Sequence, residues 1–167
     1  MKIIENFLLE SQEITEVFNK FILDNNLQEI VVADHICYKC GSNESFEDWR
    51  KVFETNSKSI YQAVISKRRI AIITFRDPIK SIAGEINYLE LSDQKIDNSQ
   101  VEGFDHIEFF PKNKNIDEVL KIFEEKNISY EKDVKPHITQ YIINVGEYNF
   151  RLAKEKVVDK IKREEFK

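Results

Sequence analysis

The chain has 167 residues, which suits one compact domain or two small fused modules, and a chain of this length can bury a core without disulfides. Hydrophobic residues make up 41% and charged residues 33%, as in an ordinary soluble globular protein. The formal net charge of −5 disfavours a nucleic-acid partner, because binding to a phosphate backbone requires a basic stripe.

The sequence also disfavours a membrane protein or an exported one. No apolar run approaches the ~20 residues of a membrane-spanning helix, and Glu5 and Glu10 fall where the apolar region of a signal peptide would lie. Cys37 and Cys40 have the C-x-x-C spacing of a redox or zinc motif, but no second cysteine pair completes a zinc site. Positions three apart on a strand face opposite sides, so we interpret them as reduced, buried thiols of a cytoplasmic protein.

The N-terminal part of the chain predicts a helix followed by a first mixed module. Apolar residues at helical spacing indicate a helix over residues 3–27, with a break near Ser11 left open, and we interpret residues 1–29 as a helical extension that covers a sheet. Residues 30–93 form the first module, with Ser45 as the candidate N-cap of its helix. Asp77-Pro78 is expected to end its third strand. The module runs strand, helix and three strands over residues 30–40, 45–53, 59–66, 70–75 and 84–91.

The C-terminal part repeats that order. The polar residues 94–103 are interpreted as a linker, and residues 104–153 as a second module. Residues 154–167 predict a charged C-terminal helix that docks loosely through few apolar positions, with its charges facing solvent. The second module is predicted as a strand, a helix and three strands over residues 104–110, 116–126, 128–134, 138–145 and 148–152.

The same tripeptide occurs on the first predicted strand of each module, as Asp34-His35-Ile36 and as Asp105-His106-Ile107. Repetition of both the motif and the element order indicates a tandem duplication of one structural unit. A lone histidine on a strand is more often a core residue than a ligand. Here the two histidines occupy equivalent positions, and a carboxylate on a last strand, Glu90, converges with them if the two sheets curl together.

Short segments in a fixed order resemble a known family. They are Ala33-Asp34-His35-Ile36 with Cys40 downstream, Arg68 through Pro78-Ile79, and Glu102 through Glu108. Over about residues 30–155 the chain resembles the vicinal oxygen chelate superfamily, which includes glyoxalases, extradiol dioxygenases and bleomycin-resistance proteins, and within it the YecM-like branch. The resemblance implies an α+β fold of two tandem βαβββ modules. These form a curled, cup-like mixed β-sheet, with an N-terminal helical extension and a C-terminal helix.

The resemblance also implies a divalent metal ion in the cup. Carried over position by position, its ligands are His35 and Glu90 in the first module and His106 in the second, with Zn, Fe, Mn and Ni all open as its identity. The fourth ligand position falls on Arg151, whose guanidinium has no lone pair to offer. At about 4 Å and an effective dielectric of about 20, a divalent ion and Arg151 would repel by on the order of 8 kcal/mol. Either Arg151 turns away, or an anionic substrate lies between them, or no metal binds and Arg151 pairs with Glu90.

Other residues are candidates for catalysis and substrate binding. Glu108 shares the strand face of His106 and is either a general base or a rim carboxylate. Tyr88 shares a face with Glu90 and either donates a hydrogen bond to substrate or packs. The candidates for substrate binding are Arg151, Arg68 and Tyr141.

Two main hypotheses for function follow from the sequence. In the first, the chain is a metal-dependent enzyme of isomerase, lyase or dioxygenase type that acts on a small anionic substrate held in the β-cup. In the second, it is a non-catalytic, metal-free binding protein for a small anion, which Arg151 suits better than it suits a four-ligand metal site. A third is a protein-interaction module that uses the N-terminal helix. Monomer and homodimer both remain open, because a fold alone does not choose a function or an assembly.

Overall fold

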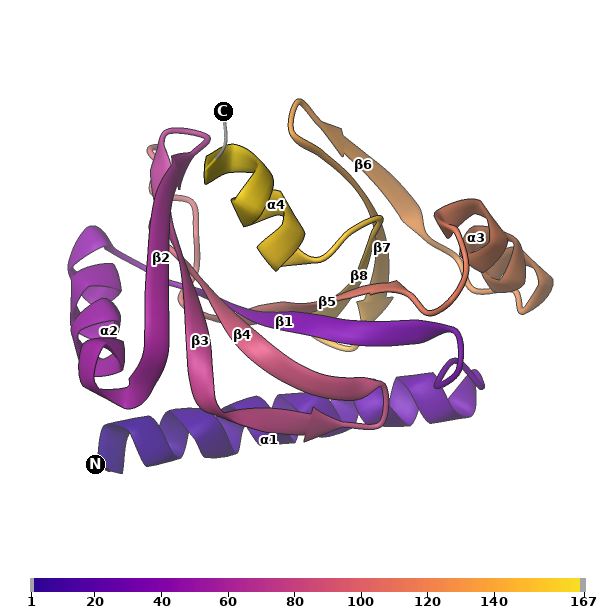
Figure 1. The fold of residues 1–167 in the computed structure, drawn as a ribbon, viewed down its shortest axis with the longest axis horizontal. Helices are drawn as coiled ribbons and strands as arrows, with labels where there is room; N and C mark the ends of the chain where they lie inside the picture. The colour runs from indigo at the N-terminus through magenta and orange to yellow at the C-terminus, as the bar shows by residue number, and fades with distance from the viewer. Residues whose placement is uncertain (1, 166–167) are drawn as a thin grey trace.

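An eight-stranded mixed β-sheet runs through the middle of the molecule (Figure 1). The computed structural model describes residues 2–165, and all elements lie within them. The helices are α1 (Lys2–Asp24), α2 (Asn43–Asn56), α3 (Ile116–Glu125) and α4 (Val157–Glu165). The strands are β1 (Val31–Lys39), β2 (Ser57–Ile65), β3 (Arg68–Ser81), β4 (Gly84–Ser92), β5 (Gly103–Pro111), β6 (Glu131–Lys135), β7 (Ile138–Val145) and β8 (Tyr148–Ala153).

The order of the strands brings the first strand of each module to the centre of the sheet. The strands lie in the order β2-β3-β4-β1-β5-β8-β7-β6. β1 pairs in parallel with β4 and antiparallel with β5, and β5 pairs in parallel with β8. This confirms the predicted α+β fold of two βαβββ modules in one curled, open sheet, with a helix at each end of the chain. Because β1 and β5 are neighbours, residues far apart in sequence face one another across their shared ladder.

α1 covers one face of the sheet, and α4 lies on the opposite, concave face (Figure 1). α1 is a single helix without a break at Ser11, whose hydroxyl is buried and donates to the carbonyl of Leu8 at 2.7 Å. Such a bond back to the preceding turn satisfies a polar side chain within a helix. The buried face of α1, which includes Phe7 and Phe18, packs against the sheet residues of the main core. Within residues 2–165, no helix is both long and apolar enough to cross a membrane.

Two local details differ from the sequence-based expectation. Ser42 caps α2 instead of Ser45, because the Ser42 side chain accepts the backbone N–H of Ser45 at 3.0 Å. β3 also does not end at Pro78 but continues to Ser81. Its pairing with β4 shifts register between Thr74 and Ile79, and an irregularity of this kind tolerates a proline, which has no N–H to give to the ladder.

The polar segment between the modules is largely exposed, but two of its glutamines are buried. Gln94 and Gln100 are both buried, and they bond to each other through backbone and side-chain atoms at 2.9 and 3.0 Å. The Gln100 amide also donates to the carbonyl of Cys40 at 2.8 Å. Polar residues can be buried here because their donors and acceptors are paired, so polarity alone did not predict exposure.

Phe150 tests the packing that joins the second module to the rest of the core. Its ring is fully buried, stacks on Phe109 with centroids 4.2 Å apart, and also contacts Phe21 and Phe123. We expect Phe150→Ala to lower the free energy of unfolding by about 3–5 kcal/mol, measured by urea denaturation, because the cavity cannot collapse fully. Leu9→Ala, at a residue 65% exposed on α1, is the control and should change it by about 0.5 kcal/mol or less. Equal effects of the two substitutions would contradict this assignment of the core.

Candidate metal centre

Two β-bulges position the histidines of the repeated motif. In the ladder between β1 and β5, the chain advances by two residues on β1 from Ala33 to His35 while it advances by one residue on β5. Asp34 is therefore the extra residue of a bulge on β1. The mirror arrangement occurs further along the same ladder, where Asp105 is the extra residue on β5. Each bulge turns an aspartate toward the histidine that follows it.

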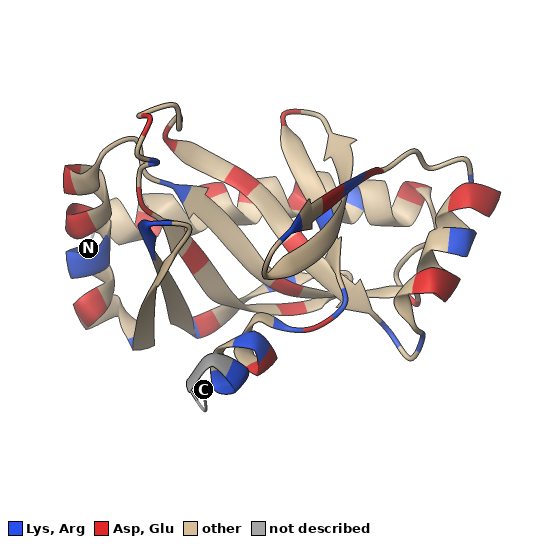
Figure 2. Cartoon of the chain, turned by 90° about the horizontal axis from the view of Figure 1, so that it is seen from above, with Lys and Arg blue, Asp and Glu red and all other residues tan. Residues whose placement is uncertain are grey.

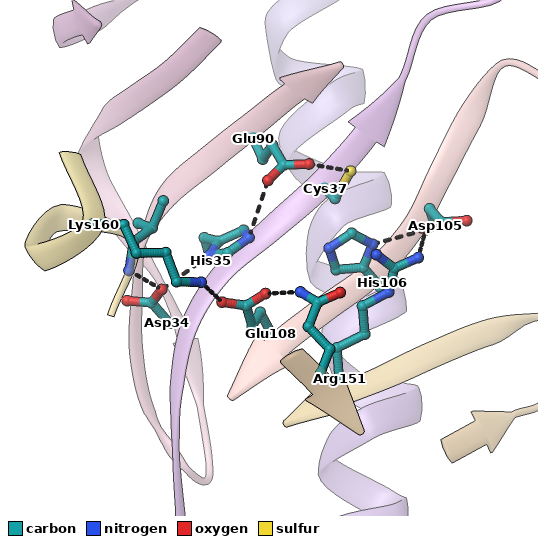
Figure 3. A network of polar contacts seen from close by, with 11 residues as sticks. Asp34, His35, Cys37, Glu90, Asp105, His106, Glu108, Arg151 and Lys160 are labelled. Atoms are coloured by element: carbon teal, nitrogen blue, oxygen red, sulfur yellow. Dashed lines mark hydrogen bonds and ion pairs between the residues drawn. The ribbon is translucent and has the colours of Figure 1, made fainter. Parts of the chain in front are cut away.

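Both aspartates bind the same atom of their histidine. The Nδ1 atom of His35 lies 2.9 Å from Asp34 Oδ2, and the Nδ1 atom of His106 lies 2.7 Å from Asp105 Oδ2 (Figure 3). A carboxylate on Nδ1 fixes the orientation of an imidazole and leaves Nε2 as the atom that can bind a metal. The two rings lie edge to face, with centroids 6.0 Å apart.

Further potential ligands share the concave face with the two histidines. Glu90 Oε2 lies 3.5 Å from His35 Nε2, and the Cys37 thiol donates to Glu90 Oε1 at 3.4 Å (Figure 3). Among the described residues, two groups of three offer ligand atoms that all lie within 4.8 Å of one another. The groups are His35, His106 and Glu108, and Cys37, Glu90 and His106. Each contains two of the three ligands predicted from the sequence, together with a third residue from β1 or β5.

One nitrogen in this cluster has no proper partner. His35 is 1% exposed, and its Nε2 atom makes no hydrogen bond to any described residue, since the 3.5 Å approach of Glu90 is long for one. A buried polar atom without a partner costs free energy in a folded protein. The unpaired atom faces a carboxylate beside a second imidazole, which is the environment of a metal ligand.

One of the sequence-based alternatives paired Arg151 with Glu90. In the structure, Arg151 pairs with Asp105 instead. Its Nη2 atom lies 3.0 Å from Asp105 Oδ2, and Lys39 forms an ion pair with the other oxygen of the same carboxylate. Arg151 and Glu108 are partners in the β5–β8 register, so the guanidinium remains beside the cluster while its charge is balanced by Asp105. Its Nε atom is buried and lacks a partner among residues 2–165.

α4 is part of the site, contrary to the expectation of a loosely docked helix with solvated charges. Lys160 Nζ lies 2.8 Å from Glu108 Oε1, and the other oxygen of Glu108 accepts the amide of Gln140 at 2.5 Å. The backbone N–H of Val157 donates to Asp34 Oδ2 at 2.8 Å. Lys162 and Arg163 are the basic residues of the last turn of α4, and Lys160 precedes them in the same helix (Figure 2). The charge pattern alone could not tell which lysine points inward.

The comparisons with known proteins identify the family of the chain. The family model described as "YecM protein" matches residues 1–157. The chain belongs to the YecM family. Protein YecM of Escherichia coli (strain K12) is 28% identical over 78 residues, which are 47% of this chain and 42% of that protein, so the match spans less than half the length of the relative.

Solved structures show that the fold of this YecM-family chain is shared. The structure described as Protein EC4020 superposes with a TM-score of 0.65 at 18% identity, covering 88% of this chain and 87% of that one. The hypothetical protein BH1468 from Bacillus halodurans C-125 has a TM-score of 0.50 at 13% identity, covering 75% and 95%. At these identities the likeness shows the fold alone, and the roles of individual residues rest on their geometry.

The structure does not bring every predicted site residue to the cluster. Tyr88 reaches its edge, as the register partner of His35, and packs in the small apolar cluster beneath α4. Tyr141 lies on the other face of β7, against the main core and the ring of Tyr130, because side chains alternate along a strand and its neighbour Gln140 takes the concave side.

Arg68 is also outside the cluster. It begins β3 at the β2–β3 turn, where its guanidinium donates to the side chain of Gln100 at 2.5 Å and to the carbonyl of Asp93 at 3.3 Å. It therefore braces the segment that joins the modules. The sequence interpretation missed roles for Asp34, Asp105, Gln140 and Lys160. For the aspartates a signal was present, since each precedes a histidine in the repeated motif.

The two histidines differ in their electrostatics. Burial lowers the pKa of His35, but the carboxylates of Glu108, Asp34 and Glu90 outweigh it and raise the pKa to about 10. Burial and the guanidinium of Arg151 lower the pKa of His106 to about 4. Burial acts to raise the pKa of Glu90, but the contact with His35 holds it well below its usual range. At neutral pH in the metal-free protein, these pKa values make the ring of His35 cationic and the ring of His106 neutral.

This asymmetry predicts two separate titrations in metal-free protein. We expect His35 to stay protonated through neutral pH and to lose its proton only toward pH 10, whereas His106 stays neutral down to about pH 4. The measurement is an NMR titration of the imidazole carbons, assigned with His35→Asn and His106→Asn. Arg151→Gln should raise the pKa of His106, because it removes a nearby cation. Two imidazoles that titrate together near 6.5 would contradict the assignment.

The same shifts fix the sign of the pH dependence of stability. The folded pKa of His35 lies above its ordinary value of 6.5, so its contribution to the free energy of unfolding is complete below about pH 6.5 and is lost as pH rises toward about 10. The folded pKa of His106 lies below 6.5, so protonation of the unfolded chain weakens folding as pH falls from about 6.5 toward 4.

Proposed function

We propose that this YecM-family chain is a divalent-metal-dependent enzyme that acts on a small anionic molecule on the concave face of its sheet. The observation that carries the proposal is the pair of imidazoles, each held at Nδ1 by the preceding aspartate, with the buried Nε2 of His35 unpaired among residues 2–165. Metal-ligating histidines almost always have such an outer carboxylate or carbonyl partner. We retain isomerase, lyase and dioxygenase types as the reaction class.

The donor types of the predicted ligands suit a divalent ion. His35, His106 and Glu90 supply two imidazoles and a carboxylate, a combination that suits Zn, Fe(II), Mn or Ni and leaves positions for substrate. The cluster also attracts positive charge. Glu90, Glu108 and Asp34 stabilise a buried proton on His35, and a metal ion would take the place of that proton.

The surrounding side chains suit an anionic substrate. A divalent ion held by these residues supplies Lewis-acid polarisation of neighbouring substrate oxygens. Arg151 offers its buried, unpaired Nε–H toward a negative group, while its Nη2 stays fixed by Asp105. Glu108 is the proposed proton acceptor, and a contact with substrate would replace one of its bonds to Lys160 or Gln140. Tyr88, at the edge of the cluster, is the proposed hydrogen-bond donor.

α4 restricts access of water to this face. Val157 is buried against Ile70 and Ile72, and Tyr88 packs partly buried against the same small cluster. A covered site strengthens electrostatic interactions inside it. We infer a cytoplasmic location from the free, buried thiols Cys37 and Cys40.

Metal content is the direct test of the proposal. We expect protein purified without chelator to carry about one equivalent of a transition metal per chain by elemental analysis, and chelation to remove it. His35→Ala with His106→Ala should abolish the binding, because both imidazole ligands are lost. His137→Ala is the matched control, since His137 is exposed at a turn, and it should retain the metal. A folded protein that takes up no Zn, Fe, Mn or Ni would refute the enzyme hypothesis.

A metal-free anion-binding protein is the second candidate, favoured by the unpaired Nε of Arg151 in the described structure. In that case, chelator-treated protein should bind small phosphorylated or carboxylate compounds as tightly as untreated protein, measured by calorimetry. Arg151→Gln should weaken the binding by about tenfold or more, because a charge-assisted hydrogen bond is worth roughly 1.5–3 kcal/mol. Binding that requires the metal supports the enzyme instead.

A further inference from the structure

We propose that the thiolate of Cys37 is a ligand of the metal ion in this cup, where it takes the place of the fourth ligand that Arg151 cannot provide. The inference rests on the proposed function and deepens it. The resulting donor set is His35 and Cys37 from β1, Glu90 from β4 and His106 from β5.

The position of Cys37 is that of a ligand and not of a core residue. Its side chain is 1% exposed and lies on the concave face, outside the main apolar cluster to which Cys40 belongs. Its sulfur is 3.4 Å from Glu90 Oε1, and the ligand atoms of Cys37, Glu90 and His106 all lie within 4.8 Å of one another. These three donors come from three adjacent strands, so the central part of the sheet already holds them together.

The Nε2 atom of His35, which has no hydrogen bond within residues 2–165, is an independent observation that points to a cation beside Glu90. This Nε2 atom is buried, lacks a hydrogen-bond partner in the described part of the chain, and lies 3.5 Å from Glu90 Oε2. The two oxygens of Glu90 therefore face Cys37 and His35, one on each side (Figure 3). A cation held by Cys37, Glu90 and His106 would lie beside the Glu90 carboxylate that the Nε2 atom of His35 faces.

The competing group of His35, His106 and Glu108 is less suited to hold the ion. Both oxygens of Glu108 are already used, one by the ammonium of Lys160 at 2.8 Å and one by the amide of Gln140 at 2.5 Å. A metal on Glu108 would place a second cation on the carboxylate that already binds the ammonium of Lys160. Binding at Cys37 leaves these contacts of Glu108 intact and breaks the weak thiol contact to Glu90. The thiol proton and the extra proton of His35 leave to solvent as the metal binds the sulfur and the Nε2 atom of His35.

A thiolate ligand also removes the conflict with Arg151. Glu90 and the Cys37 thiolate together carry two negative charges, which cancel those of a divalent ion. The guanidinium of Arg151 then lies beside a neutral centre and keeps its own partner, Asp105. A mixed nitrogen, sulfur and oxygen set favours Zn, Fe(II), Co or Ni over Mg or Ca, because thiolate is a soft ligand.

Cobalt spectroscopy tests the proposal. Chelator-treated protein is titrated with Co(II) without oxygen, and we expect one equivalent to produce a near-ultraviolet thiolate-to-cobalt charge-transfer band beside the visible ligand-field bands. Cys37→Ser should lose the charge-transfer band and weaken Co(II) binding by at least about tenfold, since loss of an outer-shell partner alone already produces that range. Cys40→Ser is the matched control: Cys40 is an equally buried thiol in the main core, and this variant should keep the band.

Each outcome separates this inference from the proposed function. Cobalt that binds with ligand-field bands but no charge-transfer band overturns the role of Cys37 and leaves a metal site. A protein that binds no cobalt overturns both. If Cys37→Ser does not fold, X-ray absorption of the unmodified protein loaded with Zn decides instead: a sulfur neighbour at about 2.3 Å supports the ligand, and a shell of nitrogen and oxygen alone refutes it.

Discussion

The hydrogen bond that the Nδ1–H of each histidine donates to the preceding, bulged aspartate is the contact on which the site depends. It exists because β1 and β5 pair antiparallel and each inserts one extra residue, Asp34 or Asp105, into the shared ladder. Without the bulge, strand alternation would point the aspartate and histidine side chains to opposite faces. With it, both imidazoles are oriented by a carboxylate, and Nε2 is left for a ligand.

The charged side chains around the two imidazole rings are arranged in pairs of opposite charge. The concave face gathers the carboxylates of Asp34, Glu90, Asp105 and Glu108, which face the cationic side chains of Lys39, Arg151 and Lys160 and the protonated ring of His35. Burying so many charges is tolerable only when each is paired. This explains why α4, which brings Lys160 to Glu108 and the backbone of Val157 to Asp34, is an integral part of the site.

The two halves of the cup have the same strand order but carry different charges. The first module ends its last strand with a carboxylate, Glu90, and the second places Arg151 at the equivalent position. Arg151 lowers the pKa of His106, while carboxylates raise that of His35, so one histidine resembles a ready ligand and the other holds a proton. A thiolate from Cys37 would suit this asymmetry. Its negative charge would lie beside His106 and would offset the positive charge of Arg151 there.

The sequence alone determined the repeated element order, the α+β class and the meeting of His35 with His106, because element order and strand alternation are local properties that a repeat makes visible. It could not determine that Ser42 caps α2, that β3 continues past Pro78, or that Gln94 and Gln100 are buried, since these depend on partners distant in sequence. Bulges depend on the register between two strands, so only the tertiary structure gave Asp34 and Asp105 their roles. Packing likewise decided that Lys160 points into the cup and that Tyr141 points to the opposite face of the sheet.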